Sequence, residues 1–428
     1  MKMYIVVFCA VAAVCRIADG RNLDESKVPR YELPDPLAGE GGGKISADEW
    51  RGRRAELMKT IAVNEYGFPL PAPAKVETKV LSEKKDALGG LATRRETKLS
   101  FFGPNGKSIS ATVLLYIPND AKGPVPVFVG LNFYGNHATT SEDGVIPFRI
   151  GFEPTERMKK SWKWPIIGNG AKRGLNARRW PYAEIVRRGY AVCTACYHEF
   201  YPDFMDVGKH SALALFMDEK DVDGPQLKYT PIGAWAWGLS RMLDYCISEP
   251  RIDGSKAAVV GHSRLGKTAL WAGAVDERFG LVCPNDSGCG GVALHKRMFG
   301  EVIADHLPHR STGSDAFWFT EPFAEARGRE AQLPYDQHEV VALIASRAVA
   351  VGVATKDVYA DPKGEYLSVK AAAPVWNLLG VETQLPDEMP RAGEAIAGPL
   401  GFHVREGEHD ILLEDWNAYM DAADRIWR

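Results

Sequence analysis

The sequence has little of several features that mark common classes of protein. Its 428 residues carry a formal net charge of only −3, and they include no basic stripe or polybasic tail, which argues against a nucleic-acid partner. The longest N-terminal apolar run, Tyr4 to Val14, is shorter than the ~20 residues that a membrane-spanning helix needs. Internal repeats and low-complexity arrays are also missing. We therefore expect an ordinary globular protein without a membrane span.

The first twenty residues match a secretory signal peptide. Lys2 supplies the positive charge, Tyr4 to Val14 the apolar stretch and Ala18-Asp19-Gly20 a cleavage region. A buried first helix is the alternative, and Cys15 also raises a lipoprotein signal, which Val14 before it matches poorly. We predict that residues 1–20 are removed on export to the periplasm or the medium, and that 21–44, rich in proline and glycine, form an N-terminal linker.

Cysteine is scarce as well. Of the seven cysteines, Cys9 and Cys15 leave with the signal peptide, so an odd number remains. Cys193 and Cys196 have CxxC spacing, but they fall in a strand-like run with no second pair or histidine cluster, which argues against a zinc or redox site. A disulfide such as Cys283–Cys289 is allowed in an exported protein. We predict no metal and no cofactor.

Strand and helix patterns alternate along the rest of the chain. Strands are expected within 96–117, around a hairpin turn at 104–106, and at 125–133, 190–196, 256–260, 279–283, 348–354 and 401–405. Helices are expected at 46–61 (capped by Ser46), 180–188, 233–248, 338–347, 366–380 and 411–427. This order predicts an α/β fold, with a mostly parallel sheet, an antiparallel edge hairpin and helices on both faces. Residues 299–333 break the pattern and are expected to form a lid or insertion.

A serine stands between the strand at 256–260 and the helix-forming run that follows. Gly261-His262-Ser263-Arg264-Leu265-Gly266 is close to the G-x-S-x-G elbow, except that the second glycine comes one position late. Such a turn exposes the hydroxyl, and the helix N-terminus behind it offers N–H groups to an oxyanion. A helix N-cap serine is the alternative interpretation.

An elbow serine needs a histidine after the last strand and an acid between the two. His409 lies in a loop before the final helix and is the predicted base, whereas His403 lies within a strand and is expected in the core. Asp286 and Asp357 each follow a parallel strand and would face the same edge of the sheet. The sequence does not choose between them. Asp361 is a weaker option that more readily caps the following turn.

Two basic residues flank the serine. The backbone N–H of Arg264 is a natural oxyanion donor, and its guanidinium could assist. Lys267 lies four positions after Ser263, so both would share one face of a helix. A solvated surface lysine is the alternative, but the helix looks buried and a buried lysine needs a partner. A cationic environment of this kind favours an ester whose acid part is polar or anionic.

With these residues the chain resembles the glucuronoyl esterases, carbohydrate esterase family 15, of the bacterial type. The resemblance runs from about residue 45 to the C-terminus and is carried by "GLNFYGNH", "GAWAWGLSRMLDY", "VVGHSRLGKTALWAGAVDERF", "NDSGCGGVAL", "FGE", "LPYDQHEVVALIASR", "DVYADPKGEY", "APVWNLLG" and "EHDILLEDW". It implies that residues 45–428 form an α/β-hydrolase three-layer sandwich. It also implies cleavage of the ester between 4-O-methyl-glucuronate of glucuronoxylan and lignin alcohols, by an enzyme expected to act as a monomer.

The resemblance assigns a role to each matching position. Ser263 matches the nucleophile, His409 the base and Arg264 an arginine that helps the oxyanion hole. Lys267 matches a lysine that holds the uronate, and Glu301 a carboxylate that binds sugar hydroxyls.

Four positions depart from the common pattern or vary within the family. Asp286 stands where many members carry glutamate, and Asp357 where some bacterial members place aspartate. Tyr359 stands where a tryptophan usually packs against the sugar, and "LPHRSTGSD" replaces a tryptophan-bearing segment and puts Arg310 near the site mouth. Another carbohydrate esterase, such as an acetylxylan esterase, and a non-catalytic glycan-binding relative are the alternatives.

Overall fold

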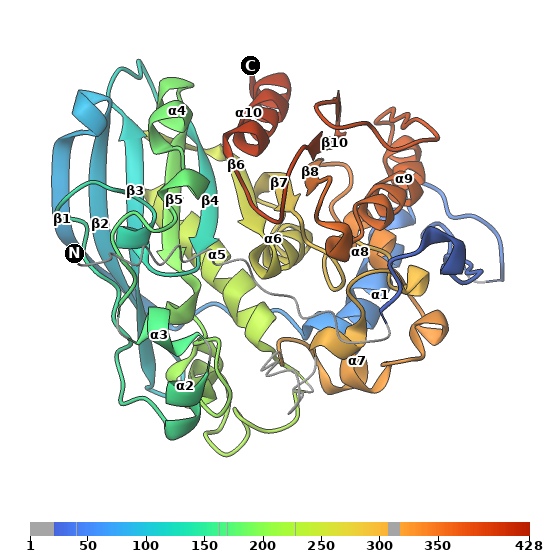
Figure 1. The fold of residues 1–428 in the computed structure, drawn as a ribbon, viewed down its shortest axis with the longest axis horizontal. Coiled ribbons are helices and arrows are strands. Elements are labelled where there is room, and N and C mark those ends of the chain that lie inside the picture. Colours follow the sequence, from blue (N-terminus) through green and yellow to red (C-terminus); the bar gives the residue numbers. More distant parts are fainter. Residues whose placement is uncertain (1–20, 40, 162, 169, 227, 307–316) are drawn as a thin grey trace, which may run out of the picture.

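One sheet runs through the whole molecule, with helices on both of its faces (Figure 1). The computed structural model describes residues 21–428 except 40, 162, 169, 227 and 307–316. The predicted signal peptide and Arg310 lie outside the described residues. None of the described helices is both long enough and apolar enough to cross a membrane.

The described strands form a 10-stranded sheet in the order β1-β2-β3-β5-β4-β6-β7-β8-β10-β9. Their bounds are β1 Lys75–Ala87, β2 Ala92–Phe102, β3 Ser108–Pro118, β4 Val125–Asn132, β5 Ala191–Cys196, β6 Ile252–His262, β7 Phe279–Asn285, β8 Ala348–Ala354, β9 Ala395–Ile396 and β10 Leu400–Arg405. The run from β5 to β10 is parallel, and β1–β3 and β9 are antiparallel at the two edges. The predicted parallel sheet with an antiparallel hairpin at its edge is confirmed.

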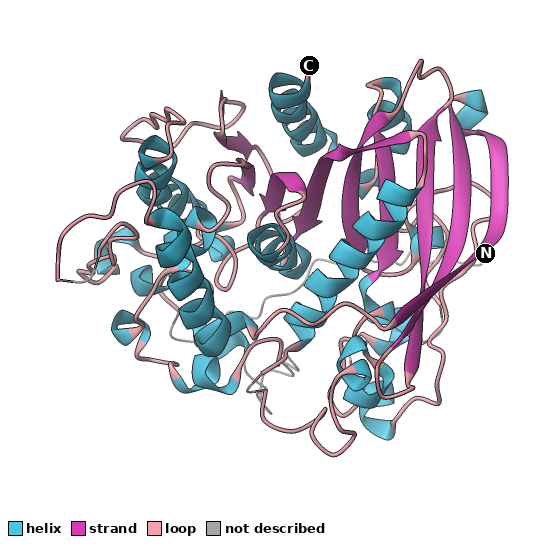
Figure 2. Ribbon diagram, turned by 180° about the vertical axis from the view of Figure 1, so that it is seen from behind, coloured by secondary structure: helices cyan, strands magenta, loops and turns pink. Residues whose placement is uncertain are grey.

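Helices cover the two faces of the sheet unequally (Figure 2). Their bounds are α1 Trp50–Ile61, α2 Glu156–Lys160, α3 Trp164–Ile167, α4 Tyr182–Arg187, α5 Pro231–Ser248, α6 Arg264–Val275, α7 Glu321–Glu325, α8 Gln337–Ala342, α9 Pro362–Leu378 and α10 Leu413–Trp427. The larger core lies under α1, α5, α6, α8 and α9, and a smaller one lies under α4 and α10. Two helix layers therefore enclose the central strands, as in a three-layer sandwich.

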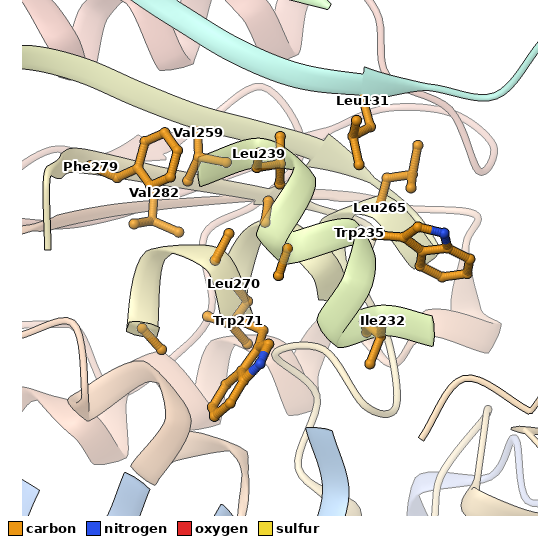
Figure 3. Packing of buried hydrophobic residues seen from close by; sticks show 14 of the residues in the cluster. Leu131, Ile232, Trp235, Leu239, Val259, Leu265, Leu270, Trp271, Phe279 and Val282 are labelled. Atoms are coloured by element: carbon orange, nitrogen blue, oxygen red, sulfur yellow. The ribbon is translucent and has the colours of Figure 1, made fainter. Parts of the chain in front are cut away.

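The core beneath α5 and α6 holds the elbow in place. Figure 3 shows Trp235 and Leu239 of α5 and Leu270 of α6 packed over Val259 of β6 and Val282 of β7. All of these side chains are buried. Because these side chains are large and closely packed, the end of β6 and the start of α6 are fixed relative to each other.

Three features of the fold differ from what the sequence indicated. Strand β1 was not expected, because it pairs only with β2, leaves nearly all its residues exposed and so has no apolar signal. Helix α1 begins at Trp50 rather than at Ser46, whose hydroxyl donates to the Glu49 carboxylate at 2.8 Å in the turn before the helix. Helix α8 ends at Ala342, five residues early.

The cysteines of the described residues are all free and buried. Cys193 and Cys196 lie in β5, as predicted, and both are buried. Cys283 and Cys289, the pair for which a disulfide was allowed, are separate thiols. The packed interior, not a covalent crosslink, therefore holds this part of the chain.

Residues 21–44 make specific contacts with the rest of the chain. Arg21 pairs with Asp305 at 2.6 Å, Glu25 pairs with Arg297 at 2.6 Å, and the carbonyl of Pro34 lies 2.8 Å from His338 Nε2. Residues 299–306 and 317–333, which did not fit the strand–helix alternation, form short helices and turns outside the sheet.

Candidate active site

Ser263 occupies a sharp turn between β6 and α6. Its φ of 59° and ψ of −131° are unusual for a residue with a side chain, and strain of this kind concentrates at functional sites. A Cβ on Gly261 would lie 2.0 Å from the carbonyl oxygen of Leu265, and one on Gly266 would lie 2.9 Å from that of Asn285. Both positions therefore need glycine.

His409 lies beside this elbow, in the loop between β10 and α10. Its Nδ1 is 2.5 Å from Oδ2 of Asp357, and its ring centroid is 4.4 Å from that of His262, the residue before Ser263. Asp357 is buried and follows β8. A carboxylate on Nδ1 leaves Nε2 as the basic nitrogen, which is the tautomer that a general base requires.

Asp286 lies close to this pair without joining it. Its Oδ1 accepts a hydrogen bond from the backbone of Ala354 at 2.8 Å, and its buried Oδ2 has no hydrogen-bond partner among the described residues. Burial raises the pKa of Asp286 well above its usual range, and the neighbouring charge of Asp357 raises it further. The structure therefore places Asp357, not Asp286, in direct contact with the imidazole.

Asp286, Asp357 and His409 offer potential metal-ligand atoms that all lie within 4.8 Å of one another. However, the His409 nitrogen on that side already contacts Asp357, and the raised pKa of Asp286 favours a protonated carboxyl, which is a poor ligand. The group fits a histidine oriented by an acid better than a metal site.

His262 packs against the ring of His409. Its Nδ1 is 2.7 Å from Oδ1 of Asn285, and burial, followed by the nearby His409, lowers the pKa of His262 well below its usual range. The ring is therefore neutral at physiological pH. A neutral neighbour can pack on His409 without opposing the positive charge that a base acquires.

Arg264 is held by an acid that the sequence did not reveal. Its guanidinium lies 2.5 Å from Oδ2 of Asp203 and 4.7 Å from the ring centroid of Trp318. Asp203 is fully buried and also contacts Lys163 at 2.8 Å and the hydroxyl of Tyr197 at 2.8 Å.

Although burial alone would raise the pKa of Asp203, Lys163 and Arg264 hold it well below its usual range. Asp203 is therefore ionised and fixes the arginine beside the serine. Its position in a loop after β5, at the carboxyl end of a parallel strand, was the only sequence signal available.

Lys267 is buried, as its helix predicted, and its partners come from the protein. Its Nζ donates to the carbonyls of Ser287 and Cys289, both at 2.6 Å, and to Glu301 Oε2 at 2.7 Å. Glu301 is 17% exposed, so the ion pair reaches the surface through the carboxylate. The structure thus brings Lys267 and Glu301, to which the resemblance gave separate roles, into direct contact.

Tyr359 lies against the same segment. Its carbonyl accepts a hydrogen bond from the Glu301 backbone at 2.8 Å, and the guanidinium of Arg21 lies 4.7 Å from its ring centroid.

His403 and Asp361, which the sequence made weaker candidates for the base and the acid, both have structural partners. His403 is buried and contacts Asp415, and Asp361 caps α9 and pairs with Arg297.

Comparison with known proteins identifies relatives of this chain. A family model described as "Glucuronyl esterase, fungi" matches residues 224–380. The chain is 39% identical over 412 residues to "Carbohydrate esterase MZ0003" of an unknown prokaryotic organism, with 95% of this chain and 92% of that protein covered. It is 32% identical over 364 residues to a "4-O-methyl-glucuronoyl methylesterase 1" of Wolfiporia cocos, covering 83% and 75%.

Solved structures of related esterases are similar to this chain in both fold and sequence. A promiscuous CE15 esterase from a marine bacterial metagenome superposes with a TM-score of 0.82 at 36% identity, covering 95% of this chain and 99% of that one. A glucuronoyl esterase from Solibacter usitatus superposes with a TM-score of 0.83 at 33% identity, covering 94% and 100%. The chain therefore belongs to carbohydrate esterase family 15, the glucuronoyl esterases, and is a carbohydrate esterase with the α/β-hydrolase fold of that family.

Proposed function

We propose that this enzyme hydrolyses the ester between 4-O-methyl-D-glucuronate of glucuronoxylan and lignin alcohols. The observation that carries the proposal is the ion pair between Glu301 and the buried Lys267, which lies four positions after Ser263. A fixed ammonium beside the nucleophile suits a sugar acid, and a partly exposed carboxylate accepts hydrogen bonds from sugar hydroxyls. The activities for which the fungal and Solibacter relatives are named support the same substrate class.

The proposed chemistry is acyl transfer in two steps. Nε2 of His409 takes the proton of the Ser263 hydroxyl while the oxygen attacks the uronate carbonyl. The bond from the carbonyl carbon to the alcohol oxygen then breaks, and the alcohol leaves with the proton from His409. Water, deprotonated by the same imidazole, attacks the acyl-enzyme and releases the glucuronic acid and the free serine.

Three groups would assist this chemistry. Asp357 orients His409 through Nδ1 and stabilises its cation. The first N–H groups of α6 lack helical partners and would donate to the oxyanion, with Arg264 adding positive charge beside them. We also propose that the protein acts outside the cytoplasm after removal of residues 1–20, which N-terminal sequencing of the exported protein would test.

The test compares two esters and two variants. We expect the wild type to hydrolyse the benzyl ester of glucuronate, and Ser263→Ala to lower kcat by about 10³-fold or more. Lys267→Met should reduce kcat/KM on the benzyl glucuronate far more than on 4-nitrophenyl acetate, because only the uronate uses the pair with Glu301.

Full turnover by Ser263→Ala would contradict the serine mechanism. Equal losses on both esters in Lys267→Met would favour an acetyl esterase instead. A fluorophosphonate probe that fails to label the wild type would favour a glycan-binding protein without activity.

A further inference from the structure

Glu365 is a buried carboxyl that the proposed chemistry does not use. It lies in the first turn of α9, and its side chain is completely buried. Its Oε1 accepts hydrogen bonds from the backbone N–H of Gly288 at 2.6 Å and from the hydroxyl of Ser287 at 3.1 Å. Its Oε2 has no hydrogen-bond partner among the described residues. Burying a carboxyl costs free energy, and both of these hydrogen bonds connect α9 to the loop after β7.

This loop is in direct contact with the ion pair beside the nucleophile. The ammonium of Lys267 donates to two carbonyls of residues 287–289, both at 2.6 Å. Gly288, the middle residue, lies against the ion pair, since a Cβ there would be 2.5 Å from Oε2 of Glu301 and 3.5 Å from Nζ of Lys267. The residue whose N–H bonds to Glu365 is therefore also the one that packs on both charged groups.

The loop holds its own shape through internal hydrogen bonds. The Ser287 hydroxyl accepts from the backbone N–H of Val292 at 2.9 Å, and the Gly291 N–H donates to the carbonyl of Gly288 at 2.9 Å. These bonds join residues within the loop, whereas those of Glu365 join the loop to a helix 77 and 78 positions away. Glu365 therefore fixes where the loop lies relative to α9.

The charge of Glu365 does not disturb the ion pair. Burial raises the pKa of Glu365 to about 8, so the carboxyl keeps its proton at pH 7. A neutral side chain adds no negative charge that would compete with Glu301 for the ammonium of Lys267. Glutamine, which has a similar shape and no charge, should therefore replace this glutamate well.

We propose that Glu365 is a positioning residue that fixes residues 287–289 and thereby the ammonium of Lys267. That this ammonium acts on a uronate rests on the proposed function. Glu365 is completely buried, so its effect passes through the loop rather than through contact with the ester. Because a binding group displaced by about 1 Å loses much of its effect, a side chain that fixes the loop influences which ester is accepted.

The experiment measures kcat/KM of Glu365→Leu at pH 7 on the benzyl ester of glucuronate and on 4-nitrophenyl acetate. We expect kcat/KM on the glucuronate ester to fall about tenfold, mainly through a higher KM, which corresponds to the loss of one or two neutral hydrogen bonds. Acetate has no sugar acid to place against Lys267, so its kcat/KM should change less than about twofold.

Two matched variants identify the cause. Glu365→Gln keeps an oxygen for the two donors of the loop and should retain the wild-type ratio of the two kcat/KM values. Ser368→Ala, also in α9, removes a buried hydroxyl that has no hydrogen-bond partner among the described residues, and it should leave that ratio unchanged as well.

Ser287→Ala disrupts the same contact more mildly and serves if Glu365→Leu does not fold. It removes one of the two hydrogen bonds to Glu365, so the ratio should fall about threefold.

Equal losses on both esters in Glu365→Leu would show that the carboxyl only stabilises the fold, and would overturn the proposal. A loss in Glu365→Gln as large as that in Glu365→Leu would overturn it too, since the oxygen that accepts the hydrogen bonds is still present.

If the wild type does not hydrolyse the glucuronate ester, the proposed function fails, and the ammonium of Lys267 itself tests the positioning. In protein that carries isotope-labelled lysine, its NMR resonance is identified by its loss in Lys267→Met. A shift of that resonance in Glu365→Leu but not in Ser368→Ala would support the proposal, and an unchanged resonance in Glu365→Leu would refute it.

Discussion

Two neighbouring loops each present an aspartate to the same corner of the active site, yet the two carboxyl groups are in different situations. Asp286 follows β7 and is completely enclosed. One of its oxygens accepts from a backbone N–H, whereas the other has no hydrogen-bond partner among the described residues and lies 3.7 Å from the Arg405 guanidinium. Asp357 follows β8 and contacts His409 directly. The difference shows that a carboxylate at the right edge of the sheet contacts the imidazole only when its side chain can reach it.

The largest expected effect is that of Asp357→Asn. The amide of the variant, placed beside Nδ1 of His409, can donate to that nitrogen and hold the tautomer whose proton is on Nε2. We therefore expect kcat/KM on the benzyl glucuronate to fall by about 10³- to 10⁴-fold. Steady-state kinetics at neutral pH would measure this fall in kcat/KM. If Asp286→Asn caused the larger loss, the assignment of the acid would have to be reversed.

Asp203→Asn should have the next largest effect. The neutral amide leaves Arg264 and Lys163 buried without their shared counter-charge. We expect kcat to fall by about 10²-fold, together with a lower Tm. Lys163→Met is the matched control, since it removes one cation and leaves the Asp203–Arg264 pair. A variant with unchanged kcat would show that the arginine needs no such support.

Asp286→Asn should change activity less than about tenfold but alter the pH dependence of stability. The raised pKa of Asp286 means that the folded protein keeps a proton that the unfolded chain loses above about pH 4. Unfolding then releases a proton, so higher pH destabilises the wild type, and this contribution is missing in the variant.

The Tm of Asp286→Asn relative to the wild type should therefore increase from pH 5 to pH 8. Thermal unfolding at several pH values measures this trend. A constant Tm difference would mean that Asp286 is ionised throughout.

The smallest effect is expected far from both loops, on the exposed edge strand. Val80 of β1 is 55% exposed, so Val80→Thr should change the unfolding free energy by less than about 0.5 kcal/mol and leave kcat/KM unchanged. Denaturant titration of this variant sets the baseline for the other three. A large loss would show that β1 is covered in solution.

Much of the site could be predicted because its signals are local in the sequence. The glycines around Ser263 indicate a tight turn, because a larger residue would clash with the backbone there. His409 follows the last core strand in a polar loop. The apolar runs of the central strands likewise report burial on both faces. Strand β1 gave no such signal, since an exposed edge strand need not be apolar.

The sequence by itself determined the central strands of the sheet, the elbow serine, the histidine and the buried lysine. Each of these follows from short-range patterns of apolar residues, glycine and loop position.

Only the tertiary structure decided which aspartate meets His409, that Asp203 holds Arg264, and that Lys267 pairs with Glu301. These pairings join residues 34 to 61 positions apart. They depend on differences of a few ångströms between loops, which no local pattern encodes.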